Sequence, residues 1–131
     1  MWQADTFDPE TIDRELGWAA DLGFNSMRVF LHDLLWADSE ALLGRVEQFL
    51  EVAESHDIGA VLVLFDGVWD PKPKPGKQRE PRPHVHNSRW VQSPGAEILG
   101  DPGRHDELEP YVSGVIERFR SDARIHAWDL F

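Results

Sequence analysis

The chain has 131 residues, which is enough for one domain with a buried core or for part of a larger domain. Its 24 acidic and 13 basic residues argue against nucleic acid as the main partner, because a phosphate backbone requires clustered positive charge. The absence of cysteine excludes disulfides, thiolate zinc sites and a cysteine nucleophile, and no apolar run approaches the ~20 residues of a membrane span.

A helix followed by a strand is predicted at the start of the chain. Asp8 is a good N-cap, and Pro9 fits the first helical position, where its missing N–H costs nothing. Gly23 supplies a stop signal for this helix. The apolar face of the helix consists of Ile12, Leu16, Ala19 and Ala20. The β-rich run at 24–31 then predicts the first strand.

A second helix and a second strand are predicted after a short loop. The apolar stripe of this helix consists of Leu42, Leu43, Val46, Phe49, Leu50 and Ala53. We predict that the helix ends at Gly59. The run at 60–65 is apolar at every position, which is typical of a strand that is covered on both faces in a parallel sheet.

A third helix and a closing strand complete the series. One face of the helix carries Leu108, Val112, Val115 and Phe119, and Pro110 is tolerable because it lies in the first turn. The run RIHAWDLF at 124–131 predicts a buried strand. Such alternation favours parallel strands joined by right-handed crossovers. Two α/β architectures fit: a small, open, doubly wound sheet, which length alone favours, or a segment of a (β/α)8 barrel, which needs ~250 residues when complete.

The long segment at 66–106 differs in composition from the rest of the chain. It holds seven of the nine prolines and seven of the thirteen basic residues. A structureless loop of this length is usually either functional or disordered. The string HNSRWVQSPG, together with Trp69, His84 and His86, is too specific for a flexible linker. Because a strand-to-helix loop opens at the C-terminal edge of a parallel sheet, where ligands bind, we predict that this loop contributes to a ligand site.

Arg28 is unusual because it lies in the middle of an otherwise apolar strand. Alternation places Met27, Val29 and Leu31 on one face of the strand and Arg28 with Phe30 on the other. A doubly wound sheet buries both faces and has little use for a guanidinium there. A barrel interior that opens onto an active site can use a guanidinium, because arginine can hold a carboxylate in a bidentate pair. Arg28 therefore favours the barrel, although pairing with a structural carboxylate remains the alternative.

Other candidate residues each have a structural alternative. His84 and His86 could chelate a metal, but no third ligand is evident, so we expect no metal site. His32 and Asp33 follow a strand and could contact a ligand, solvate the loop or cap a helix. Asp66, just past the second strand, is a candidate for the cleft. Trp36, Trp69 and Trp90 could fill the core or stack on sugars, Trp128 could pack or line a pocket, and we expect Trp18 to pack.

Four strings in the chain resemble the cellulase-like (β/α)8 glycoside hydrolases of clan A: SMRVFLHDLLW, LVLFDGVWDP, GKQREPRPHVHNSRWVQSPG and RIHAWDLF. The resemblance spans nearly the whole chain, and the loop string and the closing strand are its specific parts. It implies a partial TIM barrel, about strands 2–4 with helices 1–3. Residues 1–131 would then be the N-terminal part of one catalytic domain, with a long strand-3 loop at about 66–106.

The resemblance also implies an activity: retaining hydrolysis of a β-linked glycan such as a glucan, mannan or xylan. Such enzymes use two carboxyl groups about 5–5.5 Å apart. In this family the acid/base glutamate would follow Phe131 in an Asn-Glu-Pro motif, and the nucleophile would come from a later strand. We therefore expect no catalytic residue, Asp129 included, no cofactor and no turnover by this chain alone. The implied substrate shell consists of Arg28, His32, Asp66, His86, Asn87 and Trp90.

A half barrel would expose the strand edges near 27–31 and 125–131. We therefore expect the isolated chain to be insoluble, to self-associate or to need the missing half of the barrel. No signal peptide is apparent, so the location, cytoplasmic or secreted, stays open. Two alternatives remain: a non-catalytic, sugar-binding half barrel, and a doubly wound α/β ligand-binding domain, although the chain has neither GxGxxG nor GxxxxGK[ST].

Overall fold

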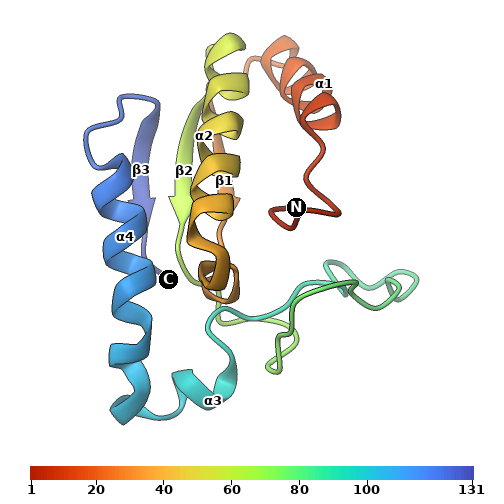
Figure 1. The fold of residues 1–131 in the computed structure, drawn as a ribbon. Coiled ribbons are helices and arrows are strands. Elements are labelled where there is room, and N and C mark those ends of the chain that lie inside the picture. Colours follow the sequence, from red (N-terminus) through yellow and green to blue (C-terminus); the bar gives the residue numbers. More distant parts are fainter.

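The computed structural model describes all residues 1–131 as an α/β fold with a three-stranded parallel sheet (Figure 1). The α-helices are α1 (Pro9–Asp21), α2 (Ser39–Ser55), α3 (Ala96–Leu99) and α4 (Glu109–Phe119). The strands are β1 (Ser26–Phe30), β2 (Gly59–Val63) and β3 (Ile125–Asp129), and 3-10 turns occupy Asp33–Asp38 and Pro102–Leu108. None of the helices combines the length and the apolar character that crossing a membrane requires.

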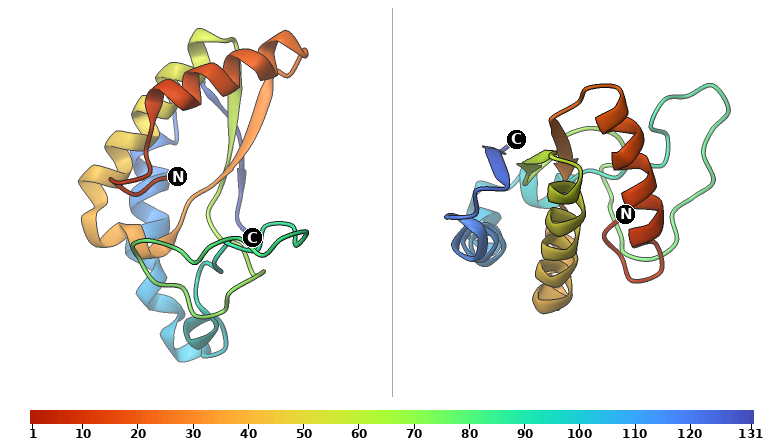
Figure 2. Two further views of the ribbon diagram at one scale, coloured as in Figure 1. Left: turned by 90° about the vertical axis from the view of Figure 1, so that its right-hand side faces the viewer. Right: turned by 90° about the horizontal axis from the view of Figure 1, so that it is seen from above.

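The sheet is small, open and wound in one direction. Its strand order is β1-β2-β3, so both crossovers step the same way, and β1 and β3 are its edges. Helices α2 and α4 lie on the same side of the strands (Figure 2, right). A small parallel α/β sheet is therefore confirmed. Helices on both faces, which define double winding, are not found in residues 1–131.

The core lies between this helical layer and β2. Helix α2 contributes Leu42, Val46, Phe49, Leu50 and Ala53, as its apolar periodicity predicts. The central strand and α4 contribute Ala60, Leu62, Tyr111, Val115 and Phe119. Tyr111 was not predicted; its hydroxyl donates a hydrogen bond of 2.9 Å to the Leu64 carbonyl, and burial raises its pKa. The sequence prediction of helix, strand and core is thus confirmed in the region where apolar periodicity is strong.

The predicted start and end of α1 are confirmed, whereas the predicted end of α2 is wrong. The Asp8 carboxylate caps α1 by accepting from the Thr11 amide at 3.1 Å, and Gly23 adopts a φ of 87° after the helix. Helix α2 ends at Ser55, and Asp57, with a φ of 57°, takes the left-handed conformation in place of Gly59. Gly59 instead begins β2, where a Cβ would lie 2.1 Å from His126 Nε2.

Tryptophan placement also departs in part from the predictions. Trp18 does not pack in the core: it is 58% exposed, with the Arg14 guanidinium over its ring. Trp36 packs against Tyr111, with 6.0 Å between the ring centroids, and Trp128 packs partly buried against the core. Trp2, which had no predicted role, is buried and packs edge-on against Phe49 of α2.

Candidate functional site

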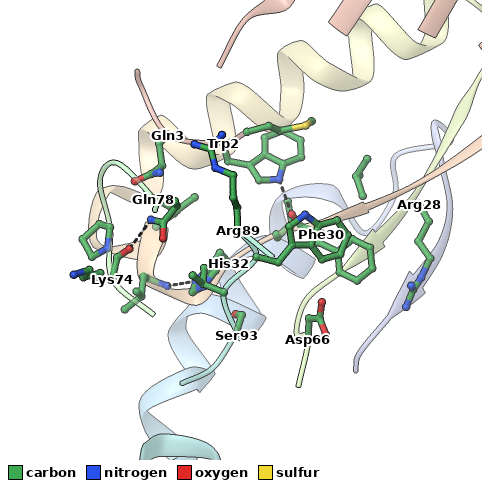
Figure 3. Close-up of a pocket in the computed structure, with 18 residues that line it drawn as sticks. Trp2, Gln3, Arg28, Phe30, His32, Asp66, Lys74, Gln78, Arg89 and Ser93 are labelled. Carbon is green, nitrogen blue, oxygen red and sulfur yellow. Dashed lines mark hydrogen bonds between the residues drawn. The ribbon is translucent and has the colours of Figure 1, made fainter. Parts of the chain in front are cut away.

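A cavity of about 440 Å³ lies at the C-terminal ends of β1 and β2 (Figure 3). Its wall comes from residues 1–3 at the N-terminus, from β1 and the turn that follows it, from Asp66 after β2, and from residues 74–93 of the long loop. In Figure 1 this loop crosses below the arrowheads of the strands. The cavity therefore lies at the edge of the sheet where parallel α/β folds bind ligands.

The long loop is held on the strand ends by polar contacts, and it contains the short helix α3, which the sequence did not predict. Asp66 and Ser93 exchange two backbone hydrogen bonds of 2.7 and 2.9 Å, which close the loop at its base. Farther out, Arg79 pairs with the Asp70 carboxylate at 2.6 Å and donates to the Ser88 carbonyl at 2.8 Å. Hydrogen bonds to Asp70 and Ser88, together with the Asp66–Ser93 bridge, thus give the loop a defined shape without a second apolar core.

Two aromatic side chains form one wall of the cavity. The ring centroids of Phe30 and Trp90 lie 5.4 Å apart, which is typical of an attractive aromatic pair. Trp90 is still 41% exposed, so part of its ring is available to a ligand. Behind this pair, the Trp2 Nε1–H donates to the Phe30 carbonyl at 2.7 Å and attaches the N-terminal segment to β1.

His32, Asp33 and Ser93 connect the end of β1 to the long loop. Ser93 Oγ donates to Asp33 Oδ1 at 2.7 Å, and His32 Nδ1 lies 3.1 Å from the same oxygen and 3.2 Å from the Leu34 amide. Burial acts to raise the pKa of Asp33, but the hydrogen bonds with His32 and Ser93 outweigh it, so this pKa is lowered. His32 Nε2 is buried without a hydrogen-bond partner. His32 thus caps the following turn, which was one of the alternatives considered for it, and it also lines the cavity.

Arg28 pairs with a carboxylate of the last strand. Its Nε and Nη2 donate to Asp129 Oδ2 at 3.0 and 2.6 Å, and its guanidinium lies 4.6 Å from the centroid of the Phe30 ring. The pair spans the sheet from β1 to β3 on the side opposite α2, and the two side chains are 52% and 30% exposed. Pairing with a structural carboxylate was the alternative for Arg28, and the residue also lines the cavity.

Four of the six predicted shell residues line the cavity together: Arg28, His32, Asp66 and Trp90. His86 and Asn87 do not. His86 packs edge-on against Trp69, with 6.4 Å between the ring centroids, and Asn87, with a φ of 52°, accepts a hydrogen bond from the Trp90 amide through its carbonyl at 2.9 Å. Asn87 therefore shapes the turn that presents Trp90. No three His, Asp or Glu side chains come together in a way that could hold a metal ion.

Sequence reasoning missed several cavity residues. Gln3 exchanges two hydrogen bonds with the backbone of Gly76, at 2.6 and 3.2 Å, and so joins the N-terminus to the loop. Lys74 and Arg89 also line the cavity (Figure 3). Arg89 could have been found, because it precedes Trp90 in the string HNSRWVQSPG. No local pattern distinguished Gln3 or Lys74, because both reach the cavity through contacts between distant parts of the chain.

The carboxylates near the cavity are all engaged. Asp33 is bonded to Ser93, Asp129 to Arg28, and Asp66 Oδ1 accepts from the Val68 amide at 3.1 Å. The cavity lining offers mainly aromatic and cationic groups to a ligand, with Asp66 as its one carboxylate. In comparisons with protein-family models, curated proteins and solved structures, no match to this chain was found.

Proposed function

We propose that residues 1–131 form about strands 2–4 with helices 1–3 of a (β/α)8-barrel glycoside hydrolase that acts on a β-linked glycan. The observation that carries this proposal is the face of the sheet opposite α2 and α4, which bears the Arg28–Asp129 ion pair. In the proposed barrel this face would line the interior. An apolar layer of helices could not cover such a pair without a desolvation cost, whereas a barrel interior that opens onto a polar cleft could accept it.

The direction of winding supports the same proposal. Parallel crossovers are right-handed in nearly all proteins, so a strand order that never reverses keeps every connecting helix on one face. Sheets that reverse their order carry helices on both faces instead. The order β1-β2-β3 has no reversal, and α2 and α4 share one side of it. This is the arrangement that a sheet needs in order to close into a barrel.

The position and the lining of the cavity support a sugar ligand. It lies at the C-terminal ends of the strands, where (β/α)8 enzymes bind their substrates. The exposed part of Trp90 offers a flat apolar surface to the C–H face of a sugar ring, and Lys74 and Arg89 offer N–H donors to its hydroxyls. In the proposed barrel, the strand that pairs with the free edge of β1 would border the cavity and complete its wall.

We expect no turnover by residues 1–131 alone. Retaining hydrolysis needs a protonated carboxyl group and a nucleophilic carboxylate on either side of the glycosidic bond. Among the residues that line the cavity, only Asp66 carries a carboxylate. The two catalytic carboxylates would therefore come from other strands of the barrel, and the residues described here would form the substrate shell and the support beneath it.

The test is to read the DNA on both sides of this reading frame and to express the longest polypeptide that it encodes. We expect a continuing barrel with Asn-Glu-Pro after Phe131 and a second glutamate at a later strand end. That protein should hydrolyse glucan, mannan or xylan oligosaccharides with retention of anomeric configuration, as followed by NMR. A stop codon after Phe131 with no complementary half encoded nearby would contradict the hydrolase proposal.

The single carboxylate in the cavity, that of Asp66, favours a second candidate, a sugar-binding half barrel without catalysis. Oligosaccharide binding that depends on Trp90, without any product, would distinguish it from the hydrolase. In both cases the free edges of β1 and β3 can pair with further strands, either the rest of the barrel or a second copy of the chain. Sedimentation of the isolated chain as a concentration-independent monomer would argue against either form of edge pairing.

A further inference from the structure

The long loop is basic in a protein that is otherwise strongly acidic. The whole chain has a formal net charge of −11. Residues 71–91 nevertheless contain six Lys or Arg residues and one acidic residue, Glu80. Positive charge is therefore concentrated in the segment that lines the cavity.

Two of these cations line the cavity without a carboxylate partner. Arg79 and Lys77, which lie farther out, pair with Asp70 and Glu80 at 2.6 and 4.0 Å. Lys74 and Arg89 form no such pair. Both line the main cavity, and both also line a second, adjoining depression, whose other charged residues are Asp70, Lys77, Arg79 and Glu80. Within the main cavity the only acidic side chain is that of Asp66.

The Arg89 side chain is placed to meet a ligand that rests on the aromatic wall. In Figure 3 it extends from the loop towards Trp2, above Phe30. The chain neighbour of Arg89 is Trp90, whose ring packs on Phe30. A guanidinium beside an apolar ring face suits a sugar that carries a carboxylate, because arginine binds carboxylates through two parallel N–H···O bonds.

We propose that the cavity recognises a uronate, a sugar bearing a carboxylate, with Arg89 and Lys74 as its cationic contacts and Trp90 as its stacking surface. This proposal rests on the proposed function, because it assumes that the cavity binds a glycan. The carboxylate can belong to an acidic side group on a neutral backbone or to a polyuronate backbone. One guanidinium without a carboxylate partner, in the same cavity as one exposed indole, fits one acidic sugar at a time from either source.

The experiment compares paired ligands on the longest polypeptide that contains residues 1–131. One pair is a xylo-oligosaccharide with a glucuronate side group and its carboxyl-reduced counterpart, and the other pair is a triuronate and its reduced form. Dissociation constants would be measured by calorimetry at low and high salt. In the pair that the cavity recognises, we expect the acidic ligand to bind roughly tenfold more tightly than its reduced form. This is the change expected for one charge-assisted hydrogen-bonded contact. The pair that shows the larger ratio identifies the source of the carboxylate.

Matched variants then assign the effect. Arg89→Gln should abolish the preference for the acidic ligand while leaving the affinity for the reduced ligand unchanged. Lys74→Gln should lower the same preference in part. Arg82→Gln removes the same charge from the same loop but outside the cavity, so the preference should persist. Trp90→Ala should weaken the binding of both ligands.

The outcomes separate this proposal from the function on which it rests. Binding of both ligands with equal affinity, dependent on Trp90, would overturn the uronate proposal and leave the glycan-binding proposal standing. The uronate proposal would also be overturned if Arg82→Gln removed the preference for the acidic ligand as fully as Arg89→Gln does. The loop would then act only through its total charge. Binding of neither ligand would overturn both.

Discussion

The helical layer and the long loop are both ordered, but different interactions hold them. Helix α2, strand β2 and helix α4 share one apolar core in which Leu42, Val46 and Val115 are fully buried. The loop at 66–106 keeps its shape through backbone bridges and polar pairs such as Arg79–Asp70. Apolar burial stabilises the fold, whereas polar contacts position exposed groups. The difference implies that changes in the core should unfold the chain, while changes in the loop should alter binding.

The largest expected effect is that of Phe49→Ala in the core. Phe49 is buried and packs against Trp2, so truncating it removes apolar contact and leaves a cavity. We expect a loss of about 3–5 kcal/mol in the free energy of unfolding, measured by denaturant unfolding. The matched control is Trp69→Ala in the loop, a large aromatic residue that is 40% exposed. An equal loss in both variants would contradict the distinction between the two regions.

The next effect is that of Ser93→Ala, at the junction between the loop and β1. Ser93 is buried and donates to the Asp33 carboxylate, so its removal should cost about 1.5–3 kcal/mol, the range for a hydrogen bond to a charged group. The lowered pKa of Asp33 stabilises the fold at a pH above the unfolded value of 3.8, and this contribution disappears as the pH falls through the folded value.

The Ser93→Ala variant should therefore lose stability most at neutral pH and differ less from the native chain in acid. Unfolding measured between pH 2 and pH 7 checks this, with the exposed Ser113→Ala on α4 as the control. A loss that is the same at every pH would show that Ser93 acts through packing and not through the Asp33 carboxylate.

The regions also differ in how far the sequence predicts them. Apolar periodicity identified the stripe of α2, the buried strand β2 and the alternation around Arg28, because these patterns are set by burial on one side of an element. The expectation that Trp18 packs was wrong, because this residue lies outside the apolar face of α1 and is accommodated by Arg14 and solvent. The end of α2 was also misplaced, because Asp57 adopts the left-handed conformation that glycine usually adopts after a helix.

The candidate site was predictable only in part, because it depends on contacts between distant residues. Position at a strand end selected His32 and Asp66, and the composition of the loop string selected Trp90; all three line the cavity. Nothing local shows that Asp66 bridges Ser93, 27 positions away, or that Gln3 bonds to Gly76. These contacts decide which loop residues face the cavity, and so His86 was selected although it packs against Trp69 instead.

A smaller effect on stability is expected for Trp90→Ala. The pairing of Trp90 with Phe30 should contribute about 0.5–1.5 kcal/mol beyond its buried area, and Trp90 is already partly exposed. Denaturant unfolding should detect this modest loss, while oligosaccharide binding should fall much further. Trp90→Phe keeps an aromatic ring on Phe30 and serves as the control. A loss as large as that of Phe49→Ala would show that the loop is part of the core.

The smallest effect is expected for the Arg28–Asp129 pair, measured as a coupling energy from Arg28→Gln, Asp129→Asn and the double variant. Because both side chains are partly exposed, on the face of the sheet opposite α2 and α4, we expect a coupling of about 0.2–1 kcal/mol in residues 1–131. In the longest polypeptide encoded by the frame, a closed barrel would exclude water from this face and strengthen the coupling, since charges attract more strongly at a lower dielectric. A coupling that is equal in the two proteins would mean that the face stays open to solvent, and the ion pair would then no longer support a barrel interior.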